Sequence, residues 1–156
     1  MNSKIFVFGS NTAGIHGAGA AKDAVVNHGA IYGQGTGPQG DSYAIATRTV
    51  APDPNGRRSP RIISLSLEDV KKHVDSFIRY AQRRPELEFQ VTQIGTGHAG
   101  FTADQMAPLF RCAPINCLFD ETWKTILGDV QRRYWGTFGT APVVSVEVTA
   151  VADGGM

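Results

Sequence analysis

The chain has 156 residues, of which 42% are hydrophobic and 19% are charged. This length and composition are typical of one compact globular domain and argue against disorder. Fifteen Lys and Arg residues are balanced by fourteen Asp and Glu residues, so the formal charge is +1. Because no overall field attracts a nucleic-acid backbone or an anionic membrane, we expect neither as a partner.

Two strands and one helix are predicted near the start of the chain, separated by glycine-rich loops. Residues 4–8 are apolar and β-rich and predict a buried strand. A glycine-rich loop follows, and apolar residues at helical spacing predict a helix over residues 18–27, with Gly29 as its stop signal. A second glycine-rich loop precedes a strand predicted at residues 43–47.

The middle of the chain contains the clearest helical pattern. Residues 51–60 include three prolines and predict an exposed connector. Apolar residues at helical spacing then predict a helix over residues 67–84, with Ser66 as its N-cap and Pro85 just after its end. Residues 88–94 alternate and predict a strand that leads into a third glycine cluster.

The last part of the chain continues this alternation of elements. Thr102 and Gln105 form a capping-box pattern that predicts a short helix. Residues 115–119 predict a buried strand, residues 120–134 a helix, and the alternating valines of residues 143–151 an edge strand. Strands that alternate with helices indicate an α/β fold with a mainly parallel sheet.

Glycines gather in three clusters, at residues 9–19, 29–40 and 95–100. Two of these clusters lie between the end of a predicted strand and the start of a predicted helix. There the free first-turn amides and the helix dipole favour an anion, and glycine lets the backbone approach it. Two such loops at the carboxyl edge of one sheet suit a diphosphate. For each glycine taken alone, a simple tight turn is the alternative.

Familiar phosphate and metal motifs are missing from the sequence. There is no GK[ST] stretch, and Gly17-Ala18-Gly19 begins too far after the first strand for a dinucleotide fingerprint. The four histidines and two cysteines lack the spacings of zinc sites, so we expect no metal and no cofactor. With two cysteines and no secretory or membrane-length apolar segment, we expect a cytoplasmic location.

Four stretches of sequence resemble a known family: FGSN, HGAGAA, GDSYAIAT and IGTGHAGF, in that order. They look like a macrodomain, specifically the compact branch that includes ADP-ribosyl-ester hydrolases and ADP-ribose-phosphate phosphatases. The resemblance implies a three-layer α/β domain over residues 1–135, whose central mixed, mainly parallel sheet is flanked by helices. Residues 136–156 would then form a C-terminal extension.

The same resemblance implies a site for ADP-ribose or a related NAD-derived nucleotide. Asn11 matches the asparagine beside the distal ribose, and Gly17 and Gly19 match the glycines that flank this ribose and the diphosphate. The later loop matches the diphosphate cradle, and Phe101 matches a position that packs on the sugar. The candidate ligand-binding residues are Gly9, Ser10, Gly17, Gly19, Gln39, Ser42, Gly95, Thr96, Gly97, Ala99, Gly100 and Phe101.

Four side chains are candidates for catalysis at the distal ribose: Asn11, Asp41, His16 and His98. Histidine titrates near neutral pH and suits proton transfer. Asp41 is the best carboxylate for activating a water, with an Asx turn as the alternative. Each histidine has a simple hydrogen-bonding role in its loop as the alternative.

Three functions follow from these patterns. We expect an enzyme that hydrolyses a bond at the distal ribose of an ADP-ribose derivative, with a free nucleotide or an ADP-ribosylated protein as its partner. The alternative is a non-catalytic binding module, a reader or sequestering protein for ADP-ribose or a cyclic NAD-derived signal. It is favoured by the absence of the acidic residue that some hydrolytic macrodomains carry in the later loop. The third is a structural or interaction protein whose glycine loops only close turns.

Overall fold

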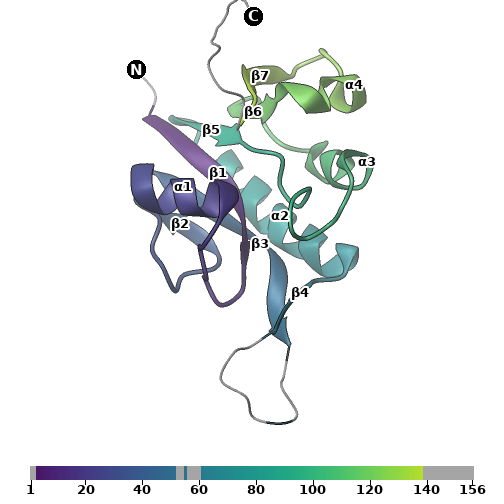
Figure 1. Ribbon diagram of the computed structural model, residues 1–156. Helices are drawn as coiled ribbons and strands as arrows, with labels where there is room; N and C mark the ends of the chain where they lie inside the picture. Colours follow the sequence, from purple (N-terminus) through teal and green to yellow (C-terminus); the bar gives the residue numbers. More distant parts are fainter. Residues whose placement is uncertain (1–2, 52–54, 56–60, 139–156) are drawn as a thin grey trace, which may run out of the picture.

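A seven-stranded sheet forms the centre of the computed structural model, which describes residues 3–51, 55 and 61–138 (Figure 1). Within these residues, the strand order is β2-β3-β1-β5-β6-β7, and β4 pairs with β3 off this path. The strands are β1 Ser3–Asn11, β2 Gly37–Gln39, β3 Ser42–Ala51, β4 Arg61–Ser64, β5 Leu87–Val91, β6 Cys117–Asp120 and β7 Arg133–Gly136. All neighbouring pairs along the order from β3 to β7 are parallel, whereas β2 and β4 are antiparallel to β3.

Helices cover both faces of this sheet. They are α1 Gly19–Asn27, α2 Leu67–Arg83, α3 Ala103–Met106 and α4 Lys124–Leu127, with 3₁₀ turns at Ala107–Phe110 and Glu121–Trp123. In β1, Phe6 and Phe8 pack with α1 on one face, while Ile5 and Val7 join the larger core under α2 on the other. A strand buried on both faces explains the continuous apolar run. The predicted three-layer α/β fold with a mixed, mainly parallel sheet is confirmed.

The capping predictions hold for two helices. The Ser66 hydroxyl accepts a hydrogen bond from the Asp69 amide at 3.1 Å, and α2 runs from Leu67 to Arg83. Thr102 and Gln105 form both hydrogen bonds of a capping box at the start of α3. Each interaction satisfies first-turn amides that have no acceptor inside the helix.

The helix predicted at residues 120–134 is wrong over most of its length. Asp120 ends β6 and its side chain caps the 3₁₀ turn that follows, and α4 stops at Leu127. Gly128 has φ +77°, a left-handed conformation that ends the helix. Val130, part of the apparent helical spacing, is 85% exposed. The chain then returns to the sheet as β7, parallel to β6.

Several other boundaries differ from prediction or lie outside the described residues. The strand predicted at residues 43–47 is longer, and β2 and β4 were not predicted. The connector expected at residues 51–60 begins with the end of β3, and residues 52–54 and 56–60 are outside the described residues, as is the edge strand expected at residues 143–151. None of the described helices is long and apolar enough to cross a bilayer.

Candidate functional site

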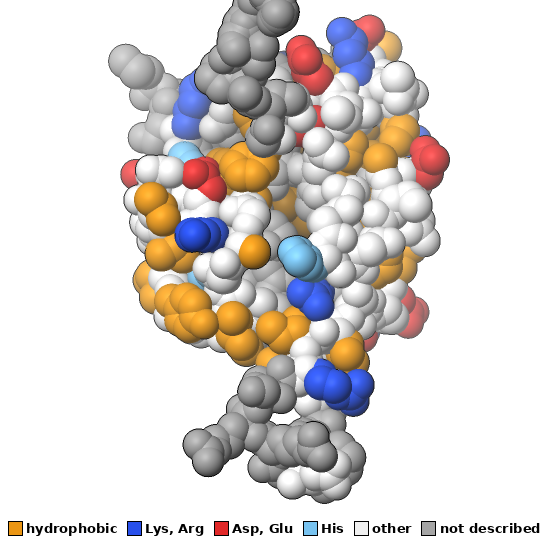
Figure 2. All heavy atoms as spheres, viewed as in Figure 1, with side chains coloured by type: hydrophobic (Ala, Val, Ile, Leu, Met, Phe, Trp, Pro, Cys, Tyr) orange, Lys and Arg blue, Asp and Glu red, His pale blue; other side chains and the backbone are white. Residues whose placement is uncertain are grey.

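A cavity of about 460 Å³ opens where β1, β3 and β5 reach their carboxyl ends. Two loops form its opposite walls: the loop between β1 and α1, and the loop between β5 and α3. Figure 2 shows this face of the molecule hollowed near its middle. The lining residues are Gly9, Ser10, Asn11, Ile15, Gly17, Ala18, Gly19, Ala20, Ala21, Thr47, Arg48, Ile62, Thr92, Gln93, Gly95, Thr96, Gly97, His98, Ala99 and Phe138. The volume is within the range of roughly 300–1,000 Å³ that is usual for small-molecule sites.

The first wall is the uncapped start of α1. Its N-cap residue, Ala18, has the extended backbone of an N-cap, but its methyl side chain accepts no hydrogen bond. The amides of Gly19, Ala20 and Ala21 have no intrahelical acceptor, and these residues line the cavity. The first turn of α1 also contains no acidic residue. These amides and the helix dipole together favour an anion at this wall.

The second wall presents further free amides. Thr96 and Gly100 donate their amides back into the loop, to the carbonyls of Gln93 and Gly97. Between them, the amides of Gly97, His98 and Ala99 make no hydrogen bond within the part of the chain that the structure describes. The loop is tied to β4 by the Ser64 hydroxyl, which donates to the Ala99 carbonyl at 2.6 Å. A run of free amides in a fixed loop is a second anion-binding element.

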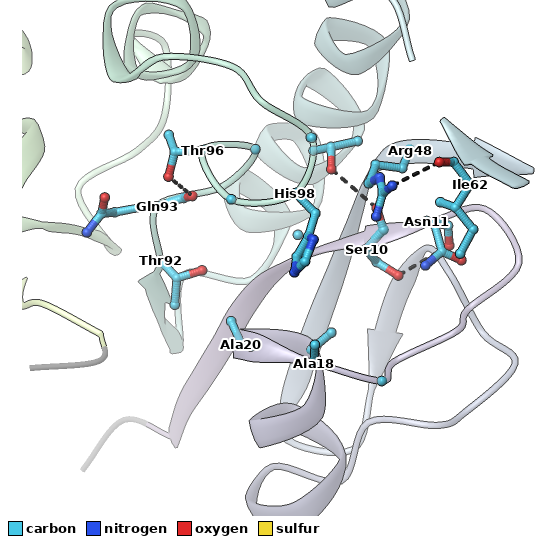
Figure 3. Close-up of a pocket in the computed structure, with 18 of the residues that line it drawn as sticks. Ser10, Asn11, Ala18, Ala20, Arg48, Ile62, Thr92, Gln93, Thr96 and His98 are labelled. Carbon is cyan, nitrogen blue, oxygen red and sulfur yellow. Dashed lines mark hydrogen bonds between the residues drawn. The ribbon is translucent and has the colours of Figure 1, made fainter. Parts of the chain in front are cut away.

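Arg48 brings a full positive charge to the cavity from β3. Its Nη2 donates to the Ile62 carbonyl at 2.9 Å, which fixes the guanidinium beside the cavity (Figure 3). Its Nε is buried and has no hydrogen-bond partner among the residues that the structure describes. No ion pair to Arg48 is present among residues 3–51, 55 and 61–138. A guanidinium held in place without a counter-charge is suited to an anionic ligand.

The lining contains no carboxylate. Arg48 and His98 are its only ionisable side chains in the described part of the chain. Figure 3 shows the His98 ring projecting from the second wall toward Ala18 and Ala20 on the first. Because two sets of free amides and one guanidinium meet without an opposing acid, the cavity favours negative charge.

Asn11 lines the cavity, but its amide is already engaged. Its Nδ2 donates to the Ile15 carbonyl at 2.9 Å, and its Oδ1 accepts from the Ile15 amide at 3.0 Å. The side chain is 6% exposed. Asn11 therefore closes the turn that leads from β1 toward α1 and shapes the first wall.

His16 does not line the cavity, although it was predicted beside the ligand. It is 3% exposed, its ring packs edge-on against Phe8, and its Nε2 hydrogen bonds to the Gln34 carbonyl at 2.9 Å. Because the carbonyl can only accept, Nε2 carries a proton and His16 links the first loop to residues 33–35. This hydrogen bond gives His16 a structural role in joining the two loops.

Asp41, Gln39 and Ser42 also lie away from the cavity. They precede or begin β3, at its amino end, whereas the cavity is at its carboxyl end. The side-chain oxygen of Gln39 accepts a hydrogen bond from the backbone amide of Ile31 at 2.7 Å, which fixes the preceding loop. The Ser42 hydroxyl donates to the Gln39 backbone carbonyl at 2.6 Å. The Asp41 amide and carbonyl join α1 to β1 by hydrogen bonds of 2.9 Å to His28 and Phe6.

The remaining predicted residues divide between the cavity and the core. Gly100 and Phe101 are not among the lining residues, and Phe101 packs against the larger core. The predicted residues that the structure does bring together are Gly9, Ser10, Asn11, Gly17, Gly19, Gly95, Thr96, Gly97, His98 and Ala99.

Five polar or aromatic lining residues were missed by the sequence analysis: Thr47, Arg48, Thr92, Gln93 and Phe138. Arg48 directly follows the strand predicted at residues 43–47, and Gln93 lies near the end of the strand predicted at residues 88–94. These positions are a usable signal, because carboxyl ends of parallel strands meet at one edge. Phe138 follows β7, which was predicted to be helical, so no sequence signal placed it.

No group of three or more His, Cys, Asp or Glu side chains suited to a metal ion occurs among the described residues. Of the two cysteines, Cys112 is exposed and Cys117 is buried. Burial raises the pKa of the Cys117 thiol to about 12. No protein-family model, curated protein or solved structure matches the chain.

Proposed function

We propose that this protein binds ADP-ribose or a closely related NAD-derived nucleotide in the cavity at the carboxyl edge of its sheet. The supporting observation is that free amides on two opposite walls meet the guanidinium of Arg48, which has no ion-pair partner among the described residues, and that no carboxylate lines the cavity. A diphosphate carries the negative charge that these groups favour. The lining also includes apolar residues such as Ile15, Ile62 and Phe138, which suit the sugar and base of a nucleotide.

The arrangement favours binding without turnover. Asp41, the carboxylate expected to activate a water, lies at the other end of β3, and both polar atoms of the Asn11 amide bond to Ile15. Hydrolysis at the distal ribose is the second candidate. It is favoured by His98, whose ring lies in the cavity without a hydrogen-bond partner in the described part of the chain.

Calorimetric titration with ADP-ribose tests the proposal, with ribose 5-phosphate and adenosine as ligands that lack the diphosphate. We expect Arg48→Met to bind ADP-ribose about 10-fold to 100-fold more weakly, because methionine keeps the apolar stem and removes the charge-assisted hydrogen bonds. Arg79→Met, on the exposed face of α2, is the matched control and is expected to bind like the wild type.

One outcome would contradict this function, and another would contradict the role of Arg48. If the folded protein does not bind ADP-ribose at millimolar concentration, the assignment is wrong. If Arg48→Met binds as tightly as the wild type, Arg48 does not contact the ligand. Incubating the same proteins with an ADP-ribosylated protein and with ADP-ribose phosphate distinguishes a reader from a hydrolase, since only a hydrolase releases product.

A further inference from the structure

Asp120 is a fully buried carboxylate that holds three segments of the chain together. It is 0% exposed and ends β6, next to the parallel strands β5 and β7. Its Oδ1 accepts hydrogen bonds from the amide and hydroxyl of Thr122, at 2.9 and 2.7 Å. Its Oδ2 accepts from the Thr137 hydroxyl at 2.8 Å, the Phe138 amide at 3.2 Å and the Gln93 amide nitrogen at 3.4 Å. Two of these partners, Gln93 and Phe138, line the cavity.

This network determines which way the Gln93 amide faces. A carboxylate can only accept, so the Gln93 atom that approaches Asp120 must be the nitrogen. The Thr137 hydroxyl donates its only proton to Asp120, so it accepts from Gln93 Nε2, at 3.3 Å. Thr137 Oγ1 and Asp120 Oδ2 lie only 2.8 Å apart, so one hydrogen of Nε2 points between them and is shared. The Gln93 Oε1 has no partner in the described part of the chain and remains an acceptor at the cavity wall.

The Gln93 end of the cavity differs in chemistry from the Arg48 end. Gln93 follows β5 and Arg48 lies on β3, with β1 between these strands, and Figure 3 shows the two side chains on opposite sides of the cavity. At the Gln93 end the half-buried ring of Phe138 packs against the smaller core cluster, with its centroid 5.7 Å from that of Phe6. An aromatic ring and a free amide oxygen in one cavity suit a planar heterocycle that offers an N–H donor.

We infer that Gln93 determines base specificity in this cavity and that Asp120 is its positioning residue. The inference rests on the proposed function, which places a nucleotide in the cavity with its diphosphate between the two walls. Gln93 Oε1 accepts a hydrogen bond from an amino group on the base, as the 6-amino group of adenine provides. A base with a carbonyl oxygen at that position places two acceptors against each other and binds more weakly.

The test compares ADP-ribose with its hypoxanthine counterpart, in which a carbonyl replaces the 6-amino group. We expect the wild type to bind ADP-ribose about tenfold more tightly than the hypoxanthine counterpart. This is the effect expected when one hydrogen bond is lost and two acceptors face each other instead. Equal affinities for the two ligands would overturn the inference and leave the proposed function intact. Failure to bind either ligand would overturn both.

Two variants separate recognition of the base from a merely structural role, because the measured quantity is the ratio of two affinities. In Gln93→Leu the ratio is expected to fall to about one, since leucine presents no acceptor. In Asp120→Asn the new side chain can donate, so the Gln93 amide can turn over and the preference for the amino group is expected to be lost or reversed. Gln82→Leu, on the exposed face of α2, is the matched control and keeps the wild-type ratio.

If Asp120→Asn does not fold, Gln93→Leu still decides the question. A tenfold preference that survives in Gln93→Leu would overturn the assignment, because another group would then be reading the base.

Discussion

Glycines at the two ends of the sheet differ in how much space surrounds them. At the amino end of β3, a Cβ added to Gly40 would lie 2.5 Å from the carbonyl oxygen of Gly29, so these glycines allow two backbones to touch. At the carboxyl end, a Cβ added to Gly17, Gly19 or Gly97 would meet nothing within 4 Å. Glycine thus permits a close backbone contact at Gly40, whereas Gly17, Gly19 and Gly97 leave open space at the cavity.

This difference is consistent with the position of the cavity at the carboxyl end of the sheet. Where Gly29 and Gly40 meet, hydrogen bonds from Asp41 to His28 and from Phe6 to Asp41 complete the contact and use the backbone groups. At the cavity, missing side chains leave first-turn and loop amides accessible. Glycine allows the chain to approach either itself or a ligand closely. The sequence alone does not distinguish these two uses, whereas the fold does.

The largest effect on stability is expected at the closed end. Gly40 has φ +57° and backbone atoms fill the space beside it, so Gly40→Ala combines a strained backbone with a steric clash. We expect the free energy of unfolding to fall by about 3 kcal/mol, as measured by chemical denaturation. Gly97→Ala is the control, with an expected change below about 0.5 kcal/mol. Equal losses in the two variants would remove the distinction between the ends.

An intermediate effect is expected at the open end, on binding rather than on stability. Gly17→Leu places a large side chain in the cavity, at a position where a Cβ meets no neighbour. The affinity for ADP-ribose should fall by about tenfold or more, or about 1.4 kcal/mol, while the melting temperature stays near that of the wild type. Gly17→Ala should change both quantities little. Normal ADP-ribose binding by Gly17→Leu would place the ligand elsewhere.

The fold was largely predictable because its signals are local. The apolar run of β1, the Ser66 cap of α2 and the capping box of Thr102 each act over a few residues, and each appears in the structure. The prediction was wrong around Val130, because the apolar spacing there matches a helix although α4 ends before Gly128. Periodicity cannot reveal a left-handed glycine that returns the chain to the sheet.

The part of the site that was predicted correctly is the part inferred from the direction of the strands. The loops after β1 and β5 reach the carboxyl edge together, as the sequence analysis expected. Asp41 directly precedes β3, so parallel pairing with β1 places it at the opposite edge of the sheet. The prediction overlooked this because Asp41 directly follows a glycine cluster. Arg48 lies toward the carboxyl end of the same strand, and its role depends on the β1–β3 register, which brings it opposite Asn11.

The account depends most on an anion binding at the uncapped start of α1, and Ala18→Asp tests this directly. An aspartate at this N-cap can accept hydrogen bonds from the first-turn amides, so the variant should be about 1 kcal/mol more stable than the wild type. The same carboxylate would occupy the amides that the ligand needs and would repel its phosphates.

Ala18→Asn provides the matched comparison, because it caps the helix without a charge. We expect both variants to melt at a higher temperature than the wild type, and the Asp variant to bind ADP-ribose about tenfold or more weakly than the Asn variant by calorimetry. If both variants are stabilised and bind ADP-ribose with equal affinity, the diphosphate does not lie at the start of α1 and the central claim is wrong.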